Sequence, residues 1–361
     1  MLFLHQGGAL KGARSETTSF ISYAVILVDC KRSTCAPVTG SAKAVFMTKA
    51  VLSMLIAVSR HGRSALIVGL LAGFLLPGLA TALKPWLPQL VMVLLFLVAL
   101  RIGPQKARDG LSNLPATLGI VLVLQLILPL GVVGVAQMLG ITQSAYVLAA
   151  VLVLAAPVVS GSPNLSILLG ADPEPAFRLL IVGTFLLPLT ILPIFWLLPQ
   201  FGDLAMATTS ALRTLVVIML AMGAGFLLRG FRLPDLKPDQ SAALDGAMSI
   251  ALAVLVIGLM AALRPALAIS IITVAGWMAL AFGLNIGLQV LSFVATRKVL
   301  SERERVPVSI VAGNRNIAIF LVALPASIAD PLLIFLGCYQ VPMYLTPLLM
   351  ERLYRLKHRS E

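Results

Sequence analysis

The feature that most constrains this chain is a series of long apolar runs between residues 64 and 354. Each run is roughly 18 to 25 residues long, which is the length of a helix that crosses the hydrocarbon core of a bilayer. With 59% hydrophobic and 11% charged residues, the chain has too little polar surface to cover a soluble fold. The sequence therefore predicts an all-α polytopic membrane protein.

Ten transmembrane helices are expected, several of them joined by short connections. A cytoplasmic tail of residues 1–60 precedes this transmembrane domain (64–354), and a short cytoplasmic tail of residues 353–361 ends the chain. The ten predicted spans cover residues 64–82, 86–103, 114–138, 144–170, 177–198, 208–229, 243–263, 266–296, 304–329 and 330–352.

The distribution of Lys and Arg supports this count of spans. With ten spans, Lys84, Arg213 and Arg264 fall on one side and Arg315 falls inside a span. All the others of the 27 basic residues fall on the opposite side, together with both chain ends. An excess of basic residues marks the cytoplasmic side of a membrane protein. We therefore expect a multi-pass protein of the cell (inner) membrane with both termini in the cytoplasm, and the net charge of +13 does not indicate nucleic-acid binding.

The N-terminal tail carries little information. Its apolar run from Phe20 to Val28 is too short to span a bilayer. Residues 44–58 are compatible with an amphipathic helix at the membrane surface. The alternatives are disorder, or an upstream extension of a protein that starts at Met47 or Met54.

Cysteine and histidine point to no cofactor or metal. Cys30 and Cys35 have no nearby histidine to complete a zinc site, and we expect all three cysteines to be reduced. The three histidines lie outside the spans, which excludes a histidine proton relay through the membrane.

Two of the ten predicted spans are interrupted by polar and helix-breaking residues. The fourth reads YVLAAVLVLAAPVVSGSPNLSILLGAD, and the ninth is broken within VAGNRNIAIF. In the fourth span the interrupting residues are Pro157, Ser160, Gly161, Ser162, Pro163 and Asn164; in the ninth they are Gly313, Asn314, Arg315 and Asn316.

The two breaks lie five spans apart, so they occupy the same position in two halves, residues 64–198 and 208–352. An odd number of spans per half inverts the second half in the membrane, which predicts an inverted repeat. Unwound backbone in a bilayer must be covered by protein or line a wet cavity. We therefore expect the broken fourth and ninth helices to cross and to form a transporter's binding site. The alternative is that Pro157 and Pro163 only kink a packed helix.

The chain resembles the bile acid:sodium symporter superfamily over residues 64–354, as a divergent bacterial-type member. The resemblance rests on AAPVVSGSPNLSILLGAD (155–172), on Thr184, Pro188 and Pro193 of the next span, and on AGNRNIAI (312–319). It implies ten helices in two inverted five-helix repeats with a crossover of helices four and nine. It also implies sodium and substrate sites around these motifs, including Thr184.

The chain departs from this family at the positions that would hold sodium. Val311 stands where a glutamate is typical, Arg315 where a glutamine is typical, and Gly183 where a serine is expected. None of the 14 acidic residues lies in a span interior. A buried Arg315 then needs carbonyl oxygens, Asn side chains or an anionic ligand as partners.

The leading functional hypothesis is a secondary carrier of a small organic anion, a carboxylate or sulfonate, that works by alternating access. Arg315 either pairs the anion by a bidentate contact or neutralises half-helix C-termini, and the two roles are compatible. Transport without sodium coupling is the leading expectation, and a sodium-coupled symporter of bile-acid-like anions is the alternative. Gln125, Asn285 and Gln289 are further binding candidates or, equally, interhelical hydrogen-bond partners. The other candidate ligands at the crossover are Asn314, Asn316, Gly313, Ser160, Ser162, Asn164 and Thr184.

Other classes fit less well. A metalloid or auxin-type efflux carrier stays open, although no cysteine lies near either break to bind arsenic. An intramembrane enzyme needs His, Asp or Glu inside the spans, so we expect no catalytic residue. The substrate, the direction of transport and the oligomeric state do not follow from the sequence.

Overall fold

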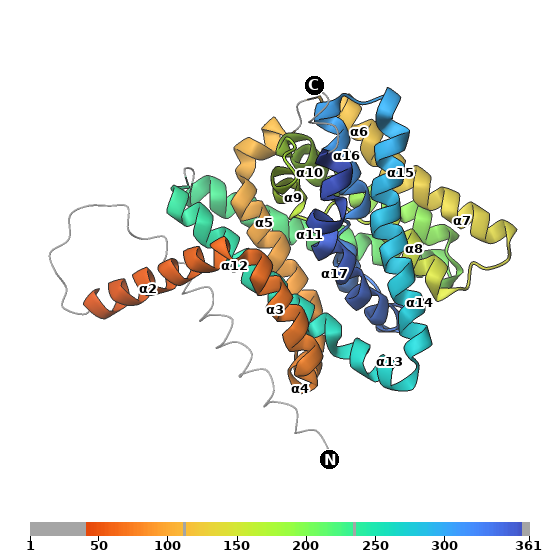
Figure 1. Ribbon diagram of the computed structural model, residues 1–361, viewed down its shortest axis with the longest axis horizontal. Helices are drawn as coiled ribbons and strands as arrows, with labels where there is room; N and C mark the ends of the chain where they lie inside the picture. Colours follow the sequence, from red (N-terminus) through yellow and green to blue (C-terminus); the bar gives the residue numbers. More distant parts are fainter. Residues whose placement is uncertain (1–40, 111–112, 234–235, 356–361) are drawn as a thin grey trace, which may run out of the picture.

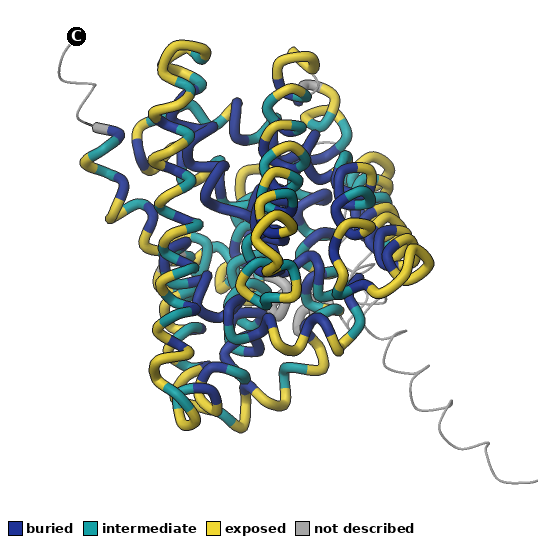
Figure 2. Tube along the Cα trace, turned by 90° about the vertical axis from the view of Figure 1, so that its right-hand side faces the viewer, coloured by how far each residue is buried: buried dark blue, intermediate teal, exposed yellow. Residues whose placement is uncertain are grey.

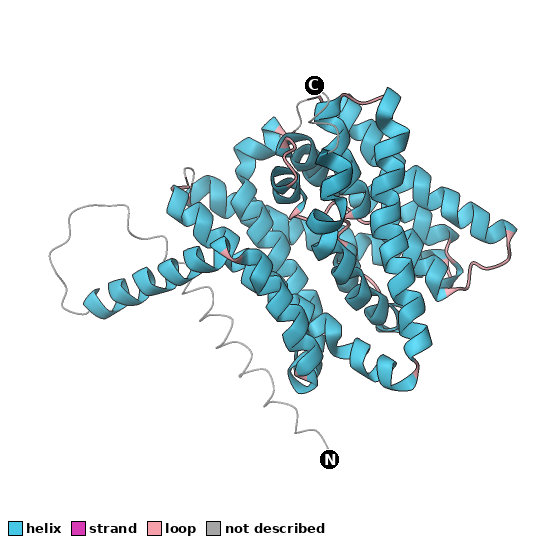
Figure 3. Ribbon diagram, viewed as in Figure 1, coloured by secondary structure: helices cyan, strands magenta, loops and turns pink. Residues whose placement is uncertain are grey.

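A computed structural model of the chain describes residues 41–110, 113–233 and 236–355, and these are almost entirely helical, with no strand among them (Figure 3). Of the two predicted tails, residues 1–40, with Cys30 and Cys35, and residues 356–361 lie outside the described residues. The helices, labelled as in Figure 1, are α2 (Ser41–Arg60), α3 (Gly62–Leu75), α4 (Pro77–Leu83), η1 (Lys84–Trp86), α5 (Leu87–Asp109), α6 (Leu114–Leu122), η2 (Val123–Ile127), α7 (Leu128–Met138), α8 (Ala145–Ala155), α9 (Ser162–Leu168), α10 (Pro173–Leu197), η3 (Pro199–Phe201), α11 (Leu204–Arg232), α12 (Pro238–Leu259), η4 (Met260–Ala262), α13 (Leu263–Ile269), α14 (Ile271–Phe282), η5 (Gly283–Gly287), α15 (Leu288–Ala295), η6 (Thr296–Lys298), α16 (Glu302–Gly313), η7 (Ile317–Val322) and α17 (Ala326–Arg355).

The lengths and surfaces of these helices are those of a membrane protein. Among the described residues, seven helices are long and apolar enough to cross a membrane, or eight if α2 and α3, bent by 90° at their junction, form one span. Exposed residues follow the outer faces of the helices (Figure 2), and many of them are large apolar side chains, with Met138 and Ile269 88% and 86% exposed. Such side chains suit lipid as a solvent. The prediction of an all-α polytopic membrane protein is confirmed at this level.

The two remaining predicted spans, 144–170 and 304–329, are each divided by a break. Neither α8 nor α16 is long enough alone to cross a bilayer. The total of ten spans therefore stays a prediction.

Two connections differ from those expected. The predicted first span, 64–82, is broken at Leu76, which has φ −115° and ψ 72° because the ring of Pro77 disfavours helical backbone in the residue before it. The helical stretch 77–108 then runs through the expected connection at 83–85. The predicted start of the eighth span at residue 266 is also wrong. The chain turns at Ser270, whose hydroxyl accepts a hydrogen bond from Thr273 N and caps α14.

The described part of the N-terminal tail is helical. Helix α2 leaves the body of the protein sideways (Figure 1) and packs against α12. The contact is close, because a Cβ added to Gly246 would lie 1.9 Å from Leu55 O.

Helices α3, α5, α11 and α12 pack against one another, while α6–α10 and α14–α17 form the rest of the body. The two parts meet where α10 packs on α11 and η7 packs on α5. Two stretches with π-helical hydrogen bonding, η2 and η5, lie in the third and eighth predicted spans. Each carries a buried amide, Gln125 and Asn285 respectively. Such segments often mark functional sites.

Close backbone contact joins α3 to α12. A Cβ on Gly69 would lie 2.9 Å from Ala253 O, and one on Gly73 would lie 2.9 Å from Ile257 Cα. Small residues four positions apart allow membrane helices to approach in this way.

We expect Gly69→Ala to lower the apparent Tm of the purified protein by about 3–10 °C, because overpacking costs about 1–3 kcal/mol. Gly223→Ala is the matched control, since Gly223 lies within α11 and its added Cβ meets nothing within 4 Å. Alanine has the higher helix propensity, so the control should keep or slightly raise the Tm. Equal Tm values for the two variants would contradict close α3–α12 packing.

Candidate functional site

The breaks of the fourth and ninth predicted spans meet and pair through their backbones. Val159 N donates to Asn314 O at 3.1 Å, and Asn316 N donates to Pro157 O at 2.8 Å. Val158 and Arg315 thereby form an isolated antiparallel bridge. Each unwound segment satisfies the other's polar groups, as a break inside a membrane requires.

Local sequence explains where α8 ends and α9 begins. Pro157 has no N–H to continue the helical ladder, and its ring favours the extended backbone of Ala156 (φ −64°, ψ 148°). Pro163 is in the first turn of α9, where its missing N–H costs nothing. Gly161 has an ordinary φ of −78°, so the backbone does not require glycine there.

Arg315 lies between the C-terminal ends of two half-helices. Its Nε donates to Ala312 O at 3.1 Å in the last turn of α16, and its Nη1 donates to Ala156 O at 3.1 Å just after α8. Both helix ends carry partial negative charge. The side chain is 2% exposed, and its Nη2 is buried without a partner. The carbonyl partners expected for a buried arginine are therefore present, and one edge of the guanidinium is unused.

Asn314 turns into a buried polar network behind the break. Its Nδ2 donates to Ile310 O at 2.8 Å, and its Oδ1 accepts from Asn285 Nδ2 at 3.3 Å and from Thr346 Oγ1 at 3.2 Å. Gln289 Nε2 donates to Asn285 Oδ1 at 3.0 Å. Gln289 Nε2 also donates to Thr346 Oγ1 of α17 at 3.3 Å, so the network fastens the break to η5 and α17.

Gly313 is enclosed by the same network. Its carbonyl oxygen accepts from Asn285 Nδ2 at 2.5 Å and from Tyr339 Oη at 2.5 Å. A Cβ on Gly313 would lie 2.0 Å from Asn285 O. Glycine is therefore the residue that lets α16 end against the π-helical segment η5.

Cavities border the break between α8 and α9. The larger one, of about 750 Å³, is lined at its inner end by Ser160, Gly161 and Asn164. Its outer residues include Arg60 and Asp245, from the side to which the charge distribution assigns the cytoplasm. A volume of this size suits a small organic molecule.

A smaller chamber of about 40 Å³ adjoins the larger cavity through Ser160. Thr184 and Asn316 also line the chamber, and most of its other walls are apolar side chains of α5, α10, α11 and α12. Thr184 Oγ1 donates to Leu180 O at 2.7 Å, so its hydroxyl proton is already used.

The structure thus divides the predicted site residues into two groups. Ser160, Gly161, Asn164, Thr184 and Asn316 line the cavities. The buried residues behind this surface that line neither cavity are Gly313, Asn314, Arg315 and Ser162.

Sequence reasoning missed two groups of residues. Tyr339 and Thr346 belong to the network around Asn314, and Tyr344 lines the larger cavity. All three lie on α17, which is read as an ordinary apolar span. The three prolines within it, at positions 331, 342 and 347, are the one signal of irregularity.

An ion-pair cluster joins the outer ends of the two broken spans. Arg303 of α16 pairs with Asp172, which caps α10, and Arg178 Nη2 lies 3.4 Å from Glu304 Oε1. The hydrogen bond from Glu174 N, reinforced by Arg303, holds the pKa of Asp172 below its ordinary value of 3.8 despite opposing desolvation. The ionised Asp172 carboxylate therefore stabilises the fold at pH values above its pKa in the unfolded chain. This stabilisation is lost as the pH falls through the lower pKa that Asp172 has in the folded protein.

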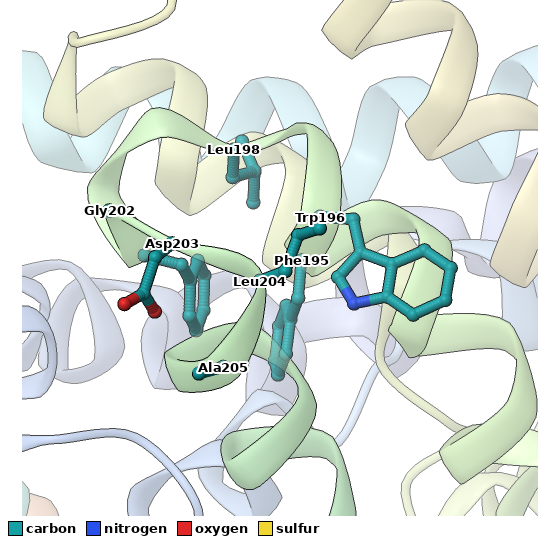
Figure 4. Close-up of a pocket in the computed structure, with 8 residues that line it drawn as sticks. Phe195, Trp196, Leu198, Gly202, Asp203, Leu204 and Ala205 are labelled. Atoms are coloured by element: carbon teal, nitrogen blue, oxygen red, sulfur yellow. The ribbon is translucent and has the colours of Figure 1, made fainter.

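Another cavity, of about 500 Å³, lies at the connection of α10 to α11 and is unrelated to the breaks (Figure 4). Phe195, Trp196 and Phe201 contribute to its walls. The carboxylate of Asp203 caps α11 by accepting from Met206 N at 2.7 Å. Its walls are mainly aromatic and apolar, and its carboxylate already serves as a helix cap.

No protein-family model matches this sequence, and no curated protein matches it. The site is therefore interpreted from its geometry and chemistry.

The two break glycines give a matched test of this geometry. We expect Gly313→Ala to lower the apparent Tm by on the order of 10 °C or to prevent folding, because the added Cβ collides with the backbone of η5. Gly161→Ala is the control, since nothing lies within 4 Å of its added Cβ. Thermal unfolding and size-exclusion profiles measure both variants. A stable, monodisperse Gly313→Ala protein would show that the breaks do not pack in this way.

Proposed function

We propose that this chain is a secondary transporter that moves a small organic anion of the carboxylate or sulfonate type by alternating access. The observation that carries the proposal is the backbone-paired crossing of two helix breaks beside a cavity of about 750 Å³. Paired discontinuous helices are the usual site of substrate binding in secondary transporters.

Corresponding features in the two halves support the inverted repeat and the ten spans that this function implies. The breaks interrupt the fourth and ninth predicted spans, and π-helical segments interrupt the third and eighth. One wall of the cavities is formed by helices from the first two predicted spans of each half. These are α3 and α5 from the first half and α11 and α12 from the second. Movement of this wall against the crossover would expose the site to alternate sides.

Charge favours an anion. Arg315 has no salt bridge to an acid among the described residues, and its partners are backbone carbonyls. Asp245 in the cavity wall pairs with Arg101, Nε to Oδ1 at 2.8 Å, whereas Arg60, which also lines the cavity, is exposed. The positive potential of the site is therefore not cancelled by neighbouring carboxylates.

Arg315 acts in this proposal as a resident cation. Two of its donor directions go to the half-helix ends, and the buried residue lines neither cavity, so its charge acts on the anion from behind the cavity wall and not by a bidentate clamp. Sodium bound beside the guanidinium would be repelled. We therefore propose transport without sodium coupling, consistent with the departure from the sodium-binding residues of the bile acid:sodium symporter superfamily.

Sodium-coupled symport is the second candidate, and one observation favours it. Gln125 Oε1 is buried and accepts no hydrogen bond, and unpaired oxygens of this kind are ligands for hard cations. A comparison of wild-type uptake in sodium and potassium buffers separates the two candidates.

In proteoliposomes, wild-type uptake of a panel of apolar carboxylates and sulfonates should be equal within about twofold in sodium and potassium buffers. Arg315→Gln should lower uptake by more than about tenfold, because the half-helix ends and the anion lose their counter-charge. Arg315→Lys is the matched control that retains the charge, and it should keep part of the activity. Steep sodium dependence of wild-type uptake would contradict the resident-cation proposal, and no uptake of any anion would contradict the transport proposal.

A further inference from the structure

Tyr344 lines the larger cavity, and its covered hydroxyl group has no hydrogen-bond partner. The residue lies on α17 and lines the cavity together with Met343 and Pro347. Its Oη is buried and makes no hydrogen bond. A buried polar group without a partner costs free energy, and each such group in a folded protein calls for an explanation.

Residues of the first break lie in the wall of the same cavity. Ser160 and Asn164 line it from the segment between α8 and α9, and Asn164 is exposed. Tyr344 therefore adds a second element, α17, to the wall of the cavity that these polar residues line. Neither element alone surrounds a solute there.

A proline in α17 leaves one backbone carbonyl of this helix without its usual hydrogen-bond donor. Pro347 has no N–H, so it cannot donate the helical hydrogen bond to the carbonyl of Met343, four residues earlier. The carbonyl of Met343 therefore lacks its usual helical donor in this part of α17. The cavity has apolar surface from Leu165, Leu168 and Leu252.

We propose that the Tyr344 hydroxyl is the specificity-determining donor for the transported solute: it binds the anionic group while the leucine-lined surface holds an apolar body. The inference rests on the proposed transport function and names its substrate class as amphipathic organic anions. The residue already lines the cavity, and in this proposal a side-chain movement brings its covered hydroxyl to the solute. The cost of the unpaired hydroxyl is then relieved in the bound state.

Binding of 4-phenylbutyrate and of its neutral amide, 4-phenylbutyramide, to the full-length protein in nanodiscs tests this proposal. Wild type should bind the carboxylate more tightly than the amide. Tyr344→Phe should weaken carboxylate binding by about ten- to a hundredfold, the value of a hydrogen bond to a charged acceptor. Binding of the amide should change much less.

Two further measurements exclude a merely structural effect. Tyr146→Phe is the matched control, because Tyr146 stacks on Trp277 away from this cavity and should bind both probes like wild type. Without probe, Tyr344→Phe should keep or raise the apparent Tm, since it removes an unsatisfied buried hydroxyl. A marked fall in this Tm would reveal a structural partner of the hydroxyl and overturn the proposal.

The outcomes also separate this inference from the transport proposal. If wild type and Tyr344→Phe bind 4-phenylbutyrate equally, the role of Tyr344 is wrong and the anion carrier stands. If wild type binds neither probe but transports other anions, the amphipathic substrate class is wrong. If it neither binds nor transports any organic anion, both proposals fail.

Discussion

Two helix ends of the same sign meet in the interior of this protein, and the contacts of Arg315 with both of them make that meeting possible. The carbonyl ends of α8 and α16 each carry roughly half an elementary negative charge. In a medium of low dielectric constant their repulsion is far stronger than in water. The guanidinium donates to Ala156 O and Ala312 O and so binds the two ends together. The backbone pairing of residues 157–159 with 314–316 depends on this neutralisation.

A covalently attached cation has a mechanistic consequence that a bound ion does not. An ion that enters and leaves can couple its own gradient to the conformational change, because its binding energy is present in one state and absent in another. Arg315 cannot leave and does not lose its proton at accessible pH. In the proposed transport cycle its charge is therefore present in every state, so the bound solute is what changes the electrostatic balance of the crossover. This is the reason for proposing uniport or exchange of anions.

Much of this arrangement is predictable from the sequence, because prolines and polar residues inside apolar runs have few physical solutions. Pro157 and the Gly313–Asn316 segment locate the breaks, and the absence of acids in the spans predicts carbonyl or ligand partners for Arg315. The direction of each side chain is not predictable in the same way. An unwound segment has no helical period, so the sequence does not show that Asn314 turns into the network and Asn316 toward the cavity. Tyr344 was missed for a related reason, since a tyrosine within an apolar span reads as ordinary packing.

The two breaks differ in how tightly they are held, and this asymmetry suggests a division of work between them. The break at Gly313 is enclosed by the backbone of η5 and by hydrogen bonds from Asn285, Tyr339 and Thr346. The break at Gly161 has open space around it and faces the cavity. A rigid segment suits the placing of the fixed charge, because a misplaced guanidinium would leave a helix end uncompensated. A less crowded segment suits contact with the solute, because its side chains can adapt. The charge and the surface that faces the cavity are thus supplied by different segments of the chain, which are joined by two backbone hydrogen bonds and by the contact of Arg315 with Ala156 O.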